Sequence, residues 1–231
     1  MINNTYFFTN PRKMPVGLPE FVDNPENRCP VILLLDTSAS MSGKPIEQLN
    51  EALIDFKQDI TRDDQACLSV EIALVTFGPV KLVHDFVTVE NFIPPSLKAD
   101  GMTPMGEAIE YALDLLEQRK QNYKTHGIVY YRPWIFLITD GAPTDHWQTA
   151  AHRIRIAEQE HRLLFFTVAV QGADIQTLKQ IAPLERPPVT LKGLDFRSLF
   201  LWLSTSMKRI SGSKIGQAVS LPPMGWGQIN T

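Results

Sequence analysis

Several features that mark large classes of proteins are absent from this sequence. It has only two cysteines among 231 residues, and the spacing of Cys29 and Cys67 fits no metal site, so we expect both to be reduced packing residues. The longest apolar runs, at 31–35 and 163–166, are far too short to span a bilayer. The first residues lack the apolar core of a secretory signal. We therefore expect a cytoplasmic protein with no membrane partner.

The sequence also has no large excess of positive or negative charge. The formal net charge is −3 and no long block of lysine and arginine occurs, so nucleic acid is not an expected partner. Hydrophobic residues make up 44% and charged residues 20% of the chain. These are the proportions of an ordinary folded domain rather than of a disordered segment.

What the sequence does contain is an alternation of strand and helix patterns. Continuous apolar runs, typical of strands buried on both faces, are separated by segments whose apolar residues recur every three or four positions. Strands are predicted at 31–36, 67–78, 80–89, 134–140, 163–170 and 189–193. Helices are predicted at 46–60, 104–124, 146–161 and 174–182, and from Asp195 onward. This order predicts an α/β fold, a doubly wound, mostly parallel six-stranded sheet with one antiparallel edge strand (80–89) and helices on both faces.

The chain is expected to hold one domain, at 31–211, with an extension at each end. Residues 1–30 and 212–231 contain proline and glycine and show no periodicity. The second extension includes the stretch PPMGW, which could pack on its own domain or dock on a partner.

The loop after the first strand lies where a phosphate-binding loop would be, but its residues do not fit one. A Walker A motif needs glycine at the position of Ser38 and serine or threonine at that of Pro45. The dinucleotide motif G-x-G-x-x-G is also absent. Nucleotide binding is therefore not favoured.

Nucleophilic catalysis finds little more support. No G-x-S-x-G elbow occurs, and Asp36 lacks a second aspartate two positions later, where Ser38 stands. His146 is the only histidine near the candidate site, and a surface position at a helix start explains it as well. A metal-assisted phosphoesterase that uses Asp36 and Asp140 stays an alternative hypothesis.

Oxygen-bearing side chains at three predicted loops indicate a metal site instead. The stretch DTSAS places Asp36, Ser38 and Ser40 directly after the first strand, Thr103 precedes a helix, and Asp140 ends another buried strand. Ligands of doubly wound sheets bind at the carboxyl ends of the strands, where the strand order reverses. Oxygen ligands of this kind suit Mg²⁺.

Each of these residues has a simpler explanation when it is taken alone. Thr103 before a proline is a good helix N-cap, the pair Asp140-Gly141 is typical of a turn, and loop serines often bond to nearby backbone. Asp145, with Gln148 three positions later, is typical of a capping box for the helix that follows. Their joint occurrence at three loops favours the metal site.

The constellation resembles the metal-ion-dependent adhesion site (MIDAS) of von Willebrand factor A (vWA) domains, and the resemblance covers roughly 31–211. The vWA fold is a Rossmann-like sheet of about six strands with an antiparallel edge, which agrees with the prediction above. The resemblance implies that Ser38, Ser40 and Thr103 contact the ion directly, whereas Asp36 and Asp140 act largely through water. It implies Mg²⁺ as the cofactor, with Mn²⁺ or Ca²⁺ able to substitute.

A narrower resemblance is to the TerY/YegL-type bacterial vWA proteins of tellurium-resistance and stress-response clusters. It is carried by the stretches FVDNPENRCPVILLLDTSASMSG, YYRPWIFLITDGAPTD and LKGLDFRSLFLWLS. It implies a bacterial, cytoplasmic setting and a protein partner, a Ser/Thr kinase or a PP2C-type phosphatase. Many relatives have glycine at the positions of Ala39 and Met102.

Together these features predict a non-enzymatic, Mg²⁺-dependent protein-interaction module. Hydroxyl ligands are weak and neutral, so the ion is left electrophilic, and an Asp or Glu of a partner would complete its coordination. Met41, Met102 and Gly141 are expected to face that partner. No positioned base for activating water is found. A vWA domain that docks through its tail without metal is a further alternative.

Overall fold

The computed structural model of the chain describes residues 21, 23, 24 and 26–229, so most of the predicted N-terminal extension lies outside the described residues. The core of the fold is one sheet in the order β3-β2-β1-β4-β5-β6-β7. Its strands are β1 Cys29–Asp36, β2 Val70–Phe77, β3 Lys81–Thr88, β4 Trp134–Thr139, β5 Leu164–Ala169, β6 Val189–Leu191 and β7 Gly227–Ile229.

Strands β1, β2, β4, β5 and β6 are parallel, and both edge strands run antiparallel to their neighbours. β1 and β2 are buried along their whole length, which explains their unbroken apolar sequences. β1 lies between β2 and β4, so the strand order reverses between β1 and β4. The predicted doubly wound sheet with an antiparallel edge strand is confirmed.

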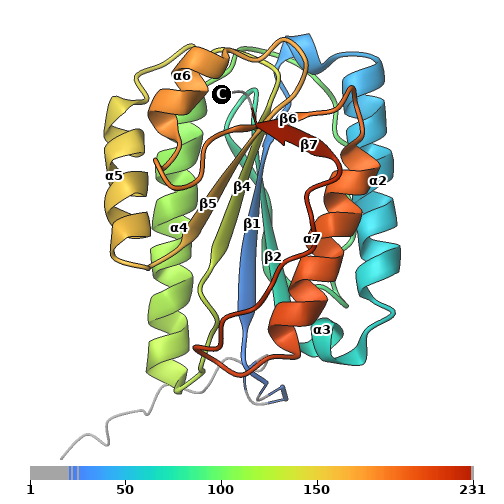
Figure 1. Ribbon diagram of the computed structural model, residues 1–231, viewed down its shortest axis with the longest axis vertical. Helices are drawn as coiled ribbons and strands as arrows, with labels where there is room; N and C mark the ends of the chain where they lie inside the picture. Colours follow the sequence, from blue (N-terminus) through green and yellow to red (C-terminus); the bar gives the residue numbers. More distant parts are fainter. Residues whose placement is uncertain (1–20, 22, 25, 230–231) are drawn as a thin grey trace, which may run out of the picture.

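The helices form two layers around the sheet, with α2, α3 and α7 on one side and α4, α5 and α6 on the other (Figure 1). Their bounds are α2 Lys44–Ile60, α3 Asp64–Ser69, α4 Met105–His126, α5 Gln148–Gln159, α6 Ile175–Ile181 and α7 Phe196–Ser211. The two faces of β1 separate two apolar cores, because its side chains alternate. Leu33 and Leu35 pack toward α2 and α7, whereas Ile32 and Leu34 pack toward α4.

Two parts of the sequence-based prediction need correction. The second strand begins at Val70 rather than at 67, because Asp64–Ser69 form helix α3, whose first turn is capped by the Asp63 carboxylate accepting from the Ala66 N–H. The sheet has seven strands rather than six, because Gly227–Ile229 pair with β6.

The segment after α7 runs back along the sheet and packs on the domain. Figure 1 shows it rising from the base of α7 to β7. Trp226 is 2% exposed and its ring meets Trp202 edge-on, and the Trp202 indole N–H donates to the Pro222 carbonyl. No helix among the described residues is long and apolar enough to cross a membrane.

Candidate metal centre

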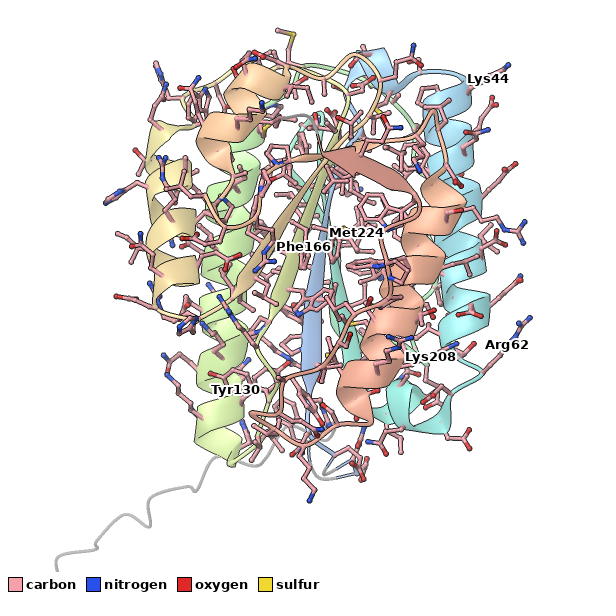
Figure 2. The ribbon with its side chains drawn as sticks, in the orientation of Figure 1. Lys44, Arg62, Tyr130, Phe166, Lys208 and Met224 are labelled. Carbon is pink, nitrogen blue, oxygen red and sulfur yellow. The ribbon has the colours of Figure 1, made fainter. Side chains whose placement is uncertain are left out.

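The five predicted ligands lie at the end of the sheet where β1 and β4 finish. Lys44, the first residue of α2, marks this end in Figure 2, whereas Tyr130 and Arg62 lie toward the opposite end. β1 ends at Asp36 and β4 at Thr139, so the loops after them start side by side. The topology therefore brings Asp36 and Asp140 together, as predicted.

The loop after β1 folds back on its own aspartate. The Ser38 backbone N–H donates to Asp36 Oδ1 over 2.8 Å, and the hydroxyls of Ser38 and Ser40 are 3.0 Å apart. The Ser40 hydroxyl donates to Asp140 Oδ1 over 2.7 Å. A chain of polar contacts thus joins the loop after β1 to the loop after β4.

Thr103 completes the cluster from the third loop. A Cβ placed on Gly141 would lie 3.3 Å from Thr103 Oγ1 and 3.8 Å from Asp36 Oδ2. Gly141 therefore leaves space between these two oxygens that a side chain would fill. All five predicted ligand residues meet at one place.

The two carboxylates of the cluster are buried and have no basic partner in the part of the chain that the structure describes. Asp36 is fully buried and Asp140 is 8% exposed, and no lysine, arginine or histidine among the described residues forms an ion pair with either. Burial raises the pKa of the Asp36 carboxyl, hydrogen bonds from Ser38 and Thr139 oppose the shift, and the charge of Asp140 adds to it. Burial also raises the pKa of Asp140, against the hydrogen bond from Ser40. A bound cation would offset this negative charge.

The backbone of the first loop is tied to its neighbours independently of the ligand side chains. The Thr37 N–H donates to the Phe77 carbonyl and the Asp100 N–H to the Thr37 carbonyl, over 3.0 and 2.8 Å. The Ala39 N–H donates to the Gly101 carbonyl. Gly101 has φ of +78°, and a Cβ there would lie 2.8 Å from the carbonyl oxygen of Gly78. This glycine is one position before Met102.

The loop after β4 holds the loop that carries Thr103. The Thr103 N–H donates to the Thr144 hydroxyl, and the Thr144 N–H donates to the Thr103 carbonyl. The Asp145 carboxylate accepts from the backbone N–H groups of Gly106 and Glu107, in the first turn of α4. A Cβ on Gly106 would lie 2.4 Å from the His146 carbonyl oxygen, so this close approach requires glycine.

These contacts correct two of the simpler explanations. Asp145 caps α4 rather than the helix that follows it, since the N-cap of α5 is Trp147. Thr103 is not a helix cap, because α4 starts after Pro104 and receives no capping hydrogen bond from a side chain at that position. The Thr103 hydroxyl is therefore free to serve as a ligand.

The three residues predicted to face a partner differ in their surroundings. Met41 is completely buried in the core beside α2, so the prediction that it contacts a partner is wrong. It is the last residue of the short 3-10 turn Ala39–Met41, in which its side chain is buried. Met102 is 68% exposed and Gly141 is half-buried beside the cluster. Their contact with a partner stays a prediction.

Sequence reasoning missed Thr139 and Thr144, which both support the cluster. The Thr139 hydroxyl donates to Asp36 Oδ2 over 2.5 Å, so both oxygens of this carboxylate accept hydrogen bonds. The signal for Thr139 was its position, because a hydroxyl residue in the buried end of an apolar strand needs a partner. Thr144 gave no such signal, since it lies in a loop.

The donor set fits a hard divalent cation. It consists of three hydroxyls and two carboxylates, and such cations prefer oxygen ligands. No group of three or more His, Cys, Asp and Glu side chains that could hold a metal occurs in the described part of the chain.

Comparison with known proteins agrees with this arrangement. Residues 31–199 match the family model for the von Willebrand factor type A domain. Human inter-alpha-trypsin inhibitor heavy chain H4 is 33% identical over 118 residues, which are 49% of this chain and 12% of that protein. An uncharacterised protein of Synechocystis is 26% identical over 141 residues, 58% of this chain and 30% of that one. The chain thus spans only a small part of these relatives.

Solved structures of low sequence identity share the fold. The pilus adhesin SpaC of Lactobacillus rhamnosus GG, in its open conformation, superposes with a TM-score of 0.65 at 13% identity, over 80% of this chain and 30% of that one. Proximal thread matrix protein 1 of the mussel byssus, with a zinc-occupied MIDAS motif, superposes with a TM-score of 0.53 at 15% identity. The match covers 79% of this chain and 48% of that one. Manganese-loaded TRAP protein of Plasmodium vivax superposes with a TM-score of 0.52 at 15% identity. The match covers 77% of this chain and 73% of that one.

Proposed function

Because the chain belongs to the von Willebrand factor type A domain family, we propose that it is a non-enzymatic protein-interaction module that depends on a divalent cation, Mg²⁺ in the cell. One observation carries this proposal. Three loops bring two buried carboxylates and three hydroxyls to one place, and no basic side chain among the described residues pairs with the carboxylates.

The hydroxyl and carboxylate side chains at this centre would have different roles. Ser38, Ser40 and Thr103 would hold the ion directly, and Asp36 and Asp140 would hold it largely through water. When bound, the ion supplies a Lewis-acidic position that a carboxylate can fill. An Asp or Glu of the partner would fill it, so metal and partner bind cooperatively, by linkage.

Two of the structural neighbours support a divalent cation at this place. The mussel protein has a zinc-occupied MIDAS motif and the Plasmodium protein is manganese-loaded. Each shares the fold of this chain. Mg²⁺ is proposed here because hydroxyl and carboxylate oxygens are its usual protein ligands.

The arrangement of Asp36 favours binding over phosphoester hydrolysis. Both of its carboxylate oxygens accept hydrogen bonds and the residue is fully buried, so it is placed to orient ligands rather than to attack a substrate. His146 is exposed and makes no side-chain hydrogen bond to a described residue of the cluster. The tail is also a poor docking element, because Trp226 is packed into the core.

Metal binding is tested by titrating the metal-free chain with Mn²⁺ and following the free ion by electron paramagnetic resonance. We expect one site, competed by Mg²⁺, whose affinity falls by at least ~10-fold in Asp140→Ala, as for loss of a charged contact. Asp195→Ala, which removes an acidic residue at the start of α7, should bind Mn²⁺ like the unmodified chain. Equal affinities in all three proteins would contradict the proposal.

We propose further that the protein is of the TerY/YegL type and acts in the bacterial cytoplasm, within a stress-response or tellurium-resistance complex that contains a Ser/Thr kinase and a PP2C-type phosphatase. The support is the resemblance of three stretches, at 21–43, 130–145 and 191–204. Affinity purification from the host, with Mg²⁺ and with EDTA, tests it. A kinase or phosphatase should be retained in Mg²⁺ alone, and its absence from both would contradict this assignment.

A further inference from the structure

A groove of about 370 Å³ opens beside the candidate metal centre. It lies between the end of β2, the start of β3 and the segment 95–100, and its lining includes Thr37 and Asp100. Thr37 stands between Asp36 and Ser38, and Asp100 stands three residues before Thr103. The groove and the metal centre therefore share the same two loops.

The shared wall is held by the backbone. The Asp100 N–H donates to the Thr37 carbonyl, and the Thr37 N–H donates to the Phe77 carbonyl. These bonds fix the groove relative to the metal centre through the two loops that they share. A chain that places a carboxylate on the metal would therefore bring its neighbouring residues toward the groove.

Two threonine hydroxyls that line the groove make no hydrogen bond to another described residue. Thr37 and Thr76 are 5% and 6% exposed, both line the groove, and neither side chain forms a hydrogen bond with another described residue. Neither hydroxyl oxygen is among the buried side-chain atoms that have no partner, so both are open to the groove. Here they are available to donate to an oxygen of a bound ligand.

The charge of the groove is opposite to that of the whole chain. Lys81 and Lys98 line it, and Asp100 is the only acidic residue among its lining residues, which leaves an excess of one positive charge. The chain as a whole carries −3. Both lysines are exposed, and within the described residues neither has an ion-pair partner. A ligand with a negative charge would complement them.

Apart from Ser96, the remainder of the groove is apolar. Val83, Leu97 and two prolines contribute to its lining, and Leu97 is held in place because its N–H donates to the Asn50 side chain and its carbonyl accepts from it. An apolar floor with basic residues suits a peptide in which an acidic residue lies near an apolar one.

We infer that this groove binds the residues of a partner protein that flank its metal-binding Asp or Glu, and that they supply a second carboxylate and an apolar side chain. The inference rests on the proposed function, because the metal-bound carboxylate sets the position of the chain. The second carboxylate pairs with Lys81 and Lys98 and accepts from Thr37 or Thr76. The partner is thus defined as an acidic protein segment rather than a single exposed acid.

Selection from random peptides displayed on phage tests this on the full chain in Mg²⁺. We expect the selected peptides to share one acidic residue, to contain a second acidic residue and an apolar residue at fixed spacing, and to elute with EDTA. If no acidic residue is enriched, the proposed function itself fails. If one acid is enriched and released by EDTA, but no second acid accompanies it, only the groove assignment is overturned.

The lysines are tested with the double variant Lys81→Glu/Lys98→Glu and a charge-matched control, Lys124→Glu/Lys214→Glu, whose positions are exposed and outside the groove. A selected peptide should bind the groove variant about tenfold more weakly, from the loss of exposed charge pairs, and the control unchanged. Mn²⁺ affinity should be preserved in both, which shows that the proteins are folded. Equal peptide affinity in the groove variant would overturn the inference.

Discussion

Hydroxyls outnumber carboxylates in the candidate centre, and their proportion decides what the site can do. Ser38, Ser40 and Thr103 are neutral, so they would cancel none of the charge of a divalent ion. Asp36 and Asp140 carry the only negative charges of the cluster, and both have a pKa raised first by burial. A centre of this composition favours a further anionic ligand from outside the chain.

Residues of the cluster could be found from the sequence because each lies at the end of an apolar strand or in a short loop next to a strand or helix. Whether a side chain in these loops points inward or outward could not be found in this way. Asp140 was predicted from its place after a buried strand, whereas the burial of Met41 depends on the 3-10 turn Ala39–Met41, which it ends. Such a turn leaves no apolar period to detect.

Met41 and Met102 form a matched pair of substitutions, because they lie on two loops of the centre and differ in burial. Met41 is completely buried and Met102 is 68% exposed. We expect Met41→Ala to lower the free energy of unfolding by ~2–5 kcal/mol, since it leaves a cavity. Met102→Ala should change it by less than ~0.5 kcal/mol. Urea unfolding measures both, and similar values would contradict the burial of Met41.

At the scale of elements, the loop after β4 positions α4 and thereby Thr103. The Asp145 carboxylate caps the first turn of a helix that precedes it in the chain by some forty residues. Capping boxes read from sequence join neighbouring positions, so this contact was assigned to the wrong helix. Helix α3 was missed for a related reason, because its residues run without a break into the apolar sequence of β2.

Asp145→Ala should therefore affect two properties at once. Loss of the cap should reduce the free energy of unfolding by ~1 kcal/mol, and displacement of Thr103 should weaken Mn²⁺ binding. Asp195 caps α7 in the same way, through the Ser198 N–H, so Asp195→Ala should show the stability loss alone. Thermal unfolding and Mn²⁺ titration of both variants distinguish these effects. Unchanged Mn²⁺ affinity in Asp145→Ala would show that the cap does not position the ligand.

At the scale of the whole molecule, the tail completes the layer that α2 and α7 begin. Phe166 and Met224 both lie over the middle of the sheet in Figure 2, and the rings of Phe136 and Phe166 stack with their centroids 4.6 Å apart beside Trp202. The doubly wound order of the sheet followed from the alternation of strands and helices. The place of the tail in this sheet could not be predicted, because a strand of three residues is too short to show a periodic pattern.

Removal of the tail after Ser211 should expose this aromatic layer. We expect a lower midpoint of thermal unfolding and binding of the dye ANS, which reports exposed apolar surface. Should the truncated chain not fold, Trp226→Ala keeps the prediction testable, with an expected loss of ~3–5 kcal/mol for a buried aromatic residue. A truncated chain that melts like the full one would contradict a structural role for the tail.

Main-chain hydrogen bonds tie the loop after β1 to Phe77, Asp100 and Gly101 without using the hydroxyl of Ser40. A single substitution can therefore remove a ligand of the metal centre without removing the backbone contacts of its loop. An allele encoding Ser40→Ala should produce normal protein levels while it lacks one ligand, whereas a gene deletion removes every function of the chain together. A difference between the two phenotypes in the host would separate what the metal centre does from what the rest of the protein does.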